Sequence, residues 1–170
     1  IVTAASSGMG AAIARKLASK GYKLAIMSGS DRILPIAEEL EAKYVRGSVT
    51  NLDDLTALVQ LAQTSYGRVD VVVNNTGHPA KGELIKVTDS EWHEGMDLIL
   101  LNVSRMARLV TPIMQNLGGG SIINISTFAG ITCTDEFRLP QATSALSNLL
   151  GSGRPQINTH THDIPKDCFY

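Results

Sequence analysis

Four groups of glycine, amide and hydroxyl residues along the chain are of the types that could bind a phosphorylated nucleotide. The first group, residues 3–10, separates an apolar dipeptide from an amphipathic stretch and has the sequence TAASSGMG. Small residues at such a turn let a phosphate approach the backbone, and the free N–H groups at a helix N-terminus attract an anion. The same residues would also make an ordinary tight turn between a strand and a helix, so both interpretations stay open.

The other three groups place polar side chains within or directly after apolar segments. Residues 71–77 end a run of valines in two asparagines and a glycine, and residues 122–130 place two hydroxyls after another apolar run. Asn102 stands alone in the apolar segment 98–103, and such an amide is costly to bury unless it is hydrogen-bonded. Each group also has a structural interpretation: a polar turn after a buried strand, Ser/Thr turn chemistry, or a satisfied structural asparagine.

The elements that must position these groups alternate between strands and helices. Short apolar runs predict strands at 24–27, 44–45, 69–73 and 121–125. Helical patterns cover 11–19, 33–42, 52–65, 88–117 and 142–150. Asn51 is a predicted helix cap, Thr88 and Glu91 have capping-box spacing, and Pro112 predicts a kink in the longest helix. The alternation predicts right-handed βαβ units, and hence an α/β fold with a doubly wound parallel sheet and helices on both faces.

Length and composition indicate one globular domain. The 170 residues are 44% hydrophobic and 18% charged, and the formal net charge is -1. We expect the α/β domain to cover residues 1–150, and residues 151–170, which lack periodicity, to form an irregular tail or an incomplete last strand region. The small net charge argues against a nucleic-acid partner, and no apolar run approaches the roughly 20 residues of a membrane helix.

The remaining polar residues give weaker signals. The chain shows no signal peptide and its two cysteines form no disulfide framework, so a cytoplasmic location is predicted. His160 and His162 do not have zinc-site spacing, and we predict no metal. Arg105 and Arg108, one helical turn apart, are expected to form a solvated or subunit-facing stripe rather than a phosphate clamp. His78 could contact a substrate, although an ordinary loop histidine is the favoured interpretation.

Taken together and in this order, the four groups resemble the classical short-chain dehydrogenase/reductase family, including its 3-oxoacyl-ACP reductase-like members. The resemblance covers roughly residues 1–150. It implies a Rossmann-like fold and the transfer of a hydride between NAD(P)(H) and a small alcohol or carbonyl substrate. The family's long helix often packs between subunits, so the resemblance also implies a homodimer or homotetramer.

The resemblance assigns cofactor contacts to several of these segments. In the glycine-rich turn, the residues that would wrap the pyrophosphate and the adenosine ribose are Thr3, Ser6, Ser7, Gly8, Met9 and Gly10. Ser48 and Val49 would lie against the adenine, and the adenosine and nicotinamide-ribose side would be lined by Asn75, Thr76 and Gly77. Ala4 replaces the family's first glycine. Ser28 stands where a carboxylate would bind the ribose of NAD, and its loss favours NADP.

The same resemblance makes Asn102, Thr127 and Ser126 the candidate catalytic residues. The family's tyrosine and lysine, four residues apart on one helix face, fall at Leu139 and Thr143, which carry no transferable proton and no charge. Two functions therefore stay open. We favour an NAD(P)-dependent oxidoreductase whose proton donor lies in sequence outside residues 1–170, or is replaced by another group or by water. The alternative is a non-catalytic dinucleotide-binding or subunit-partner relative.

Overall fold

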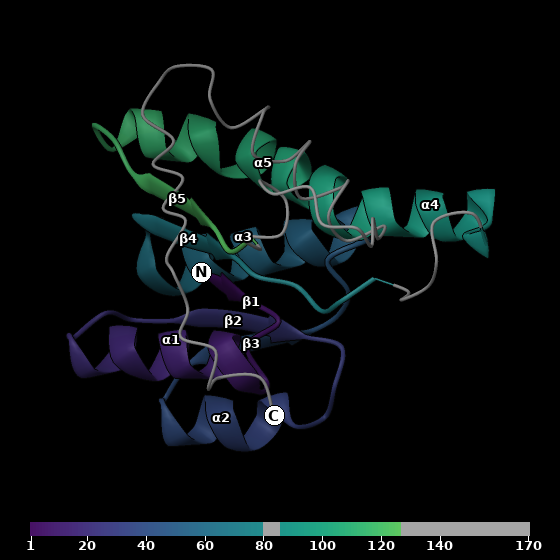
Figure 1. The fold of residues 1–170 in the computed structure, drawn as a ribbon. Coiled ribbons are helices and arrows are strands. Elements are labelled where there is room, and N and C mark those ends of the chain that lie inside the picture. The colour runs from purple at the N-terminus through teal and green to yellow at the C-terminus, as the bar shows by residue number, and fades with distance from the viewer. Residues whose placement is uncertain (80–85, 127–170) are drawn as a thin grey trace.

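Five parallel strands form one sheet in a computed structural model that describes residues 1–79 and 86–126 (Figure 1). The strand order is β3-β2-β1-β4-β5. In chain order the strands are β1 (Val2–Thr3), β2 (Ala25–Ser28), β3 (Lys43–Arg46), β4 (Val71–Asn74) and β5 (Ser121–Asn124). The order runs outward from β1 on both sides, which confirms the predicted Rossmann-like, doubly wound parallel sheet.

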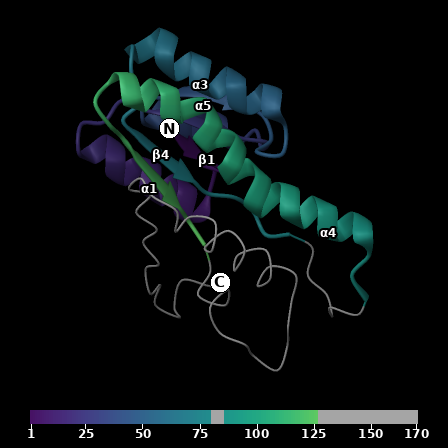
Figure 2. The ribbon, with the colours of Figure 1, turned by 90° about the horizontal axis from the view of Figure 1, so that it is seen from above.

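Helices cover both faces of the sheet, as expected for this fold class. The helical segments are α1 (Gly8–Ser19), α2 (Ile33–Glu39), α3 (Leu52–Tyr66), α4 (Asp89–Met96), η2 (Asp97–Leu101) and α5 (Asn102–Asn116). Figure 1 shows α1 and α2 on one face of the sheet and α3 and α5 on the other. Figure 2 shows α3 and α5 side by side, with α4 continuing the line of α5.

The core lies in two layers because successive strand residues point to opposite faces of the sheet. Met27 of β2 belongs to the cluster under α3 and α5, together with Leu58 and Met106. The preceding Ile26 belongs to the cluster under α1 and α2, together with Ala14. All five side chains are fully buried. This division explains why the strands are nearly continuous apolar runs rather than alternating ones.

Local capping signals in the sequence are confirmed. The Asn51 side chain accepts hydrogen bonds from the N–H groups of Asp53 and Asp54 at the start of α3. At the other end of that helix, Gly67 adopts a left-handed φ of 73°, a conformation that glycine adopts without steric cost. Both ends are therefore determined by residues within a few positions of the helix.

The longest predicted helix, at 88–117, is not one regular α-helix. It consists of α4, the π-helical turn η2 and α5. Pro112 lies inside α5, which continues to Asn116, so the departure from α geometry lies at 97–101 rather than at the proline. The helix predicted at 142–150 and the domain boundary predicted at residue 150 lie outside the described residues.

The capping box of α4 yields a pH-dependent prediction. Hydrogen bonds from the Thr88 backbone N–H and hydroxyl to the Glu91 carboxylate lower the pKa of Glu91. The stabilisation is therefore present above the carboxyl's unfolded pKa and is lost as pH falls through its folded pKa. We expect Thr88→Ala to lower the free energy of unfolding by about 1 kcal/mol at pH 7 in urea titrations.

The matched control for this prediction is Ser104→Ala, because Ser104 is an exposed hydroxyl residue in the interior of α5. We expect this control to change the free energy of unfolding by less than about 0.5 kcal/mol. The effect of Thr88→Ala should also shrink at pH 3. An effect of equal size at both pH values would contradict the assigned role of the Glu91 carboxylate.

Candidate functional site

A cleft of about 530 Å³ lies at the carboxyl edge of the sheet. Residues that follow β1, β2, β3 and β4 form most of its lining, and Leu98 of η2 adds to it. Ten of the residues predicted to contact a cofactor line this cleft: Ser6, Ser7, Gly8, Met9, Ser28, Ser48, Val49, Asn75, Thr76 and Gly77. Segments far apart in the sequence therefore converge where open parallel sheets bind their ligands.

The turn between β1 and α1 is held to β4 from behind the cleft. Thr3 does not line the cleft, because its buried hydroxyl donates to the backbone oxygen of Asn75 at 2.6 Å and accepts from the Asn75 N–H at 2.9 Å. The Asn75 side chain donates to the backbone oxygen of Ala4 at 3.2 Å. Gly10 is also buried behind the cleft, where a Cβ would lie 2.2 Å from that same Ala4 oxygen. Thr3 and Gly10 thus shape the turn without facing the cleft.

Ala4 adopts a backbone conformation that favours glycine. Its φ is 47°, in the left-handed region that costs an L-residue about 1 kcal/mol or more. We expect Ala4→Gly to raise the free energy of unfolding by up to about 1 kcal/mol in urea titrations, because the released strain exceeds the added chain entropy. Ala5→Gly is the matched control. Ala5 is fully buried with an ordinary φ, so its replacement should lower the free energy of unfolding, and equal losses in both variants would refute the argument.

The end of β2 carries hydroxyl groups where an acidic residue would exclude a phosphate. Ser28 and Ser6 share a hydrogen bond of 2.8 Å between their hydroxyl oxygens. Arg32 also lines the cleft, and its backbone N–H and Nε both donate to the Ser30 hydroxyl at 3.3 Å. Among residues 1–79 and 86–126, no aspartate or glutamate lines the cleft. Arg32 therefore brings a guanidinium to the cleft, with no carboxylate among the described lining residues.

Asn102 begins α5 directly after η2 and is 4% exposed. Its side-chain N–H donates to the backbone oxygen of Leu98, so the donor side of this amide is hydrogen-bonded, as expected of a structural asparagine. Its Oδ1 has no hydrogen-bond partner among the described residues. The buried hydroxyl oxygens of Thr76 and Ser126 also have no hydrogen-bond partner among the described residues. Buried polar atoms usually have a hydrogen-bond partner, so a bound group would supply the hydrogen bonds that these three atoms lack.

Two contacts near the cleft involve residues that the sequence named but whose partners it did not predict. Asn74 donates from its side chain to Asn124 Oδ1 at 2.9 Å, so a buried amide pair joins β4 to β5 at their carboxyl ends. In the sequence, the signal that could have revealed this pair is the asparagine within each of the two β-branched runs. Arg105 does not fit the solvated alternative of the predicted stripe, because its side chain is 21% exposed and paired with Asp97, whereas Arg108 is exposed. The subunit-facing alternative stays a prediction. Thr127, Leu139 and Thr143 lie outside the described residues.

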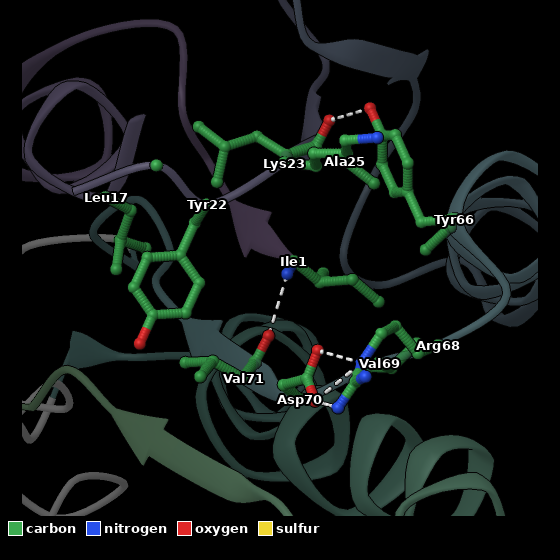
Figure 3. Close-up of a pocket in the computed structure, with 13 residues that line it drawn as sticks. Ile1, Leu17, Tyr22, Lys23, Ala25, Tyr66, Arg68, Val69, Asp70 and Val71 are labelled. Carbon is green, nitrogen blue, oxygen red and sulfur yellow. Dashed lines mark hydrogen bonds and ion pairs between the residues drawn. The ribbon is translucent and has the colours of Figure 1, made fainter. Parts of the chain in front are cut away.

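A second cavity of about 330 Å³ lies at the opposite, amino edge of the sheet (Figure 3). The Ile1 amino group donates to the Val71 backbone oxygen there at 2.8 Å, and Arg68 pairs with Asp70. The hydrogen bonds from Arg68 lower the pKa of the Asp70 carboxyl. None of the predicted cofactor or catalytic residues lines this cavity. The chemistry suggested by the sequence therefore concentrates at the carboxyl edge.

Within residues 1–79 and 86–126, no helix has the length and apolar character that crossing a membrane requires. The same ranges contain no group of three or more His, Cys, Asp or Glu side chains placed to hold a metal ion.

Comparison with known proteins places this chain among dehydrogenases and reductases. The 3-oxoacyl-[acyl-carrier-protein] reductase FabG of Staphylococcus epidermidis is 34% identical over 137 residues, which are 76% of this chain and 56% of the relative. L-sorbose reductase from Gluconobacter frateurii, solved with NADPH and L-sorbose, has a TM-score of 0.83 and 25% identity over 88% of this chain and 60% of that one.

A second solved structure, which holds NAD, is similar to this chain to the same degree. A short-chain dehydrogenase/reductase from Burkholderia phymatum in complex with NAD has a TM-score of 0.83 and 27% identity, covering 88% of this chain and 56% of that one. The chain thus spans little more than half the length of such relatives. A family model for short chain dehydrogenases matches residues 1–138. The chain therefore belongs to the short-chain dehydrogenase family.

Proposed function

We propose that this chain supplies the cofactor site and part of the active site of an NADP-dependent oxidoreductase. The enzyme would transfer a hydride between the nicotinamide and a small alcohol or carbonyl substrate. The observation that carries the proposal is the cleft at the carboxyl edge, where the glycine-rich turn, the Asn-Asn-Thr-Gly segment and the ends of β2 and β3 meet. Family membership supports the same chemistry.

The residues around the cleft fit a dinucleotide in shape and charge. Gly10 leaves no room for a side chain, so the turn packs tightly against β4 while small residues face the cleft. Ser7, which precedes α1, makes no side-chain cap, and no acidic residue occupies the first turn of this helix. The first N–H groups of a helix have no intrahelical partner and attract an anion. We infer that the pyrophosphate lies against Ser7, Gly8 and Met9.

Ser28 and Arg32 support NADP as the preferred cofactor. A carboxylate at the end of β2 would bind the ribose hydroxyls of NAD and repel a 2′-phosphate, and Ser28 carries no charge. The Arg32 guanidinium lines the same end of the cleft and can make charge-assisted hydrogen bonds to a phosphate. The relatives solved with NADPH and with NAD show that both cofactors occur among similar proteins, so the choice rests on these residues.

The catalytic proposal rests on unpartnered buried atoms. When bound, the nicotinamide supplies or accepts the hydride. Asn102 Oδ1 would accept a hydrogen bond, for example from a water in a proton relay, and the Ser126 hydroxyl would donate one to the substrate oxygen. Thr127 is proposed for the same role from its position in the family pattern alone. Since Leu139 and Thr143 stand at the family's tyrosine and lysine positions, the proton would come from a residue outside residues 1–170, from another group or from water.

Substrate, assembly and location are proposed from the family alone. The names of two relatives describe reduction of a 3-oxoacyl group and of L-sorbose, so we propose carbonyl compounds of these classes as the first substrates to test. A homodimer or homotetramer and a cytoplasmic location stay predictions. The positions that bear on the non-catalytic alternative, Leu139 and Thr143, lie outside the described residues, and no described residue favours that alternative.

The decisive experiment is a titration with NADPH and with NADH, followed by the fluorescence of the reduced nicotinamide. We expect saturable binding of both, with NADPH the tighter ligand. Ketones, sugars and 3-oxoacyl thioesters would then be added and NADPH oxidation followed by absorbance. Turnover of one class would support the oxidoreductase. Failure to bind either dinucleotide would refute the proposal, and binding without turnover across the panel would favour a non-catalytic relative.

A further inference from the structure

Arg105 on α5 connects two segments that lie far apart in the sequence. Its Nη1 donates to Asp97 Oδ1 at 2.6 Å and to the backbone oxygen of Thr50 at 3.0 Å. The Arg105 and Asp97 side chains are only 21% and 29% exposed. By comparison, the side chains of three other ion pairs are 41–69% exposed: Arg15–Glu39, Arg46–Asp31 and Arg68–Asp70. The Arg105 contacts are therefore less weakened by solvent than ordinary surface pairs.

On one side, these contacts hold the connection between β3 and α3. The Thr50 and Ser48 hydroxyls share a hydrogen bond of 2.8 Å, and the Thr50 N–H donates to the Ser48 hydroxyl at 3.2 Å. The Ser48 N–H in turn donates to the Asp54 carboxylate at 2.8 Å. Ser48 and Val49 line the cleft. The Thr50 oxygen bound by Arg105 is thus part of a rigid loop that forms one wall of the cleft.

On the other side, the contacts hold the first residue of η2. Asp97 opens this π-helical turn, and its backbone oxygen accepts the Asn102 N–H that closes the turn. Leu98 of the same turn lines the cleft, and its backbone oxygen accepts from the Asn102 side chain. π-helical turns are rare and are often found at functional sites. The contact between Arg105 and Asp97 holds such a turn beside the cleft.

We propose that Arg105 is a positioning residue that fixes the distance between the Ser48–Val49 wall and the η2 wall of the cleft. One guanidinium nitrogen satisfies acceptors on both walls, so neither wall moves without breaking a charge-assisted hydrogen bond. A lysine could keep the charge, but its ammonium is more strongly hydrated and sits on a flexible stem, so it would hold the two acceptors less firmly. This inference rests on the proposed function only in assigning a dinucleotide to the cleft. The link between the walls stands on the contacts alone.

The test compares Arg105→Met and Arg105→Lys with the control Arg108→Met, using the whole chain. Arg108 is exposed on the same helix one turn away. Hydrogen–deuterium exchange of the unliganded proteins is measured first. We expect Arg105→Met to speed exchange at least tenfold in both 47–51 and 97–102, Arg105→Lys to have an intermediate effect, and Arg108→Met to have none. Unchanged exchange in either segment of a folded Arg105→Met variant would overturn the link.

Cofactor affinity is the second readout, and a purely structural role of Arg105 would leave it unchanged in the folded variants. The probes are NADPH and 2′-phospho-ADP-ribose, which lacks the nicotinamide. We expect Arg105→Met to raise the Kd of both about tenfold, with partial rescue by lysine. Wild-type affinity in Arg105→Met would overturn the positioning role. If the wild-type chain bound neither probe, the proposed function would fall, while the exchange data would still decide whether Arg105 links the two walls.

Discussion

Replacing Gly10 with alanine is expected to lower the free energy of unfolding by about 3 kcal/mol and to abolish dinucleotide binding. A Cβ on Gly10 would lie 2.2 Å from the Ala4 backbone oxygen and 2.7 Å from Asn75 Nδ2. The first of these atoms belongs to the backbone, so the collision cannot be relieved by a side-chain rotation. Either α1 moves away from the turn or the Asn75–Ala4 hydrogen bond breaks, and both changes distort the turn assigned to the pyrophosphate.

Urea unfolding followed by circular dichroism, together with NADPH titration, would measure both effects of Gly10→Ala. Gly77→Ala is the matched control for stability, because a Cβ there meets nothing within 4 Å and no positive φ is required. We expect Gly77→Ala to change the free energy of unfolding by less than about 1 kcal/mol. A Gly10→Ala variant as stable as Gly77→Ala would show that the turn relaxes easily, contrary to the packing argument.

Arg32→Gln is expected to raise the Kd for NADPH tenfold or more while leaving the Kd for NADH nearly unchanged. A charge-assisted hydrogen bond to a phosphate contributes about 1.5–3 kcal/mol, and about 1.4 kcal/mol corresponds to a factor of ten in affinity. The 2′-phosphate is present in NADPH and absent from NADH. Because Arg32 lines the cleft beside Ser28 and the described part of the lining has no carboxylate, the lost charge should affect the phosphorylated cofactor alone.

The matched control for Arg32→Gln is Arg46→Gln. Arg46 lies at the end of β3, does not line the cleft and pairs with Asp31 on an exposed surface. Titrations of all three proteins with both cofactors, at one fixed salt concentration, would separate a local contact from the general effect of removing a positive charge. Equal weakening of NADPH binding by both substitutions, or equal weakening of NADPH and NADH by Arg32→Gln, would refute the assignment.

The sequence predicted those features of the fold that local interactions determine. The Asn51 cap, the capping box at Thr88 and the glycine end at Gly67 each depend on residues within a few positions of one another. The parallel sheet followed from valine-rich runs that alternate with helical patterns. These signals also placed most of the predicted cofactor residues at one edge of the sheet, where they line a common cleft.

The features that the sequence did not predict depend on distant partners or on small changes in backbone geometry. The π-helical turn at 97–101 has no side-chain signature, since Asp-Leu-Ile-Leu-Leu is equally compatible with a regular helix. Arg105 looked like a surface residue because its partner Thr50 is 55 positions away. The Asn74–Asn124 pair likewise joins residues 50 positions apart. Helix periodicity and motif spacing carry no information about such pairings.

The order of the strands has a further consequence, for the entropy of forming the cleft. Strands β1, β2 and β3 are neighbours in both sequence and space, whereas β1 meets β4 through Thr3 and Asn75, which are 72 residues apart. Closing a longer loop costs more chain entropy, so the β1–β4 contact is the most expensive in the sheet. The cleft lies across this contact. A chain in which only the first three strands have paired therefore lacks both the Asn75 contacts that hold the turn after β1 and the opposite wall, so the cleft forms only when both halves of the sheet have joined.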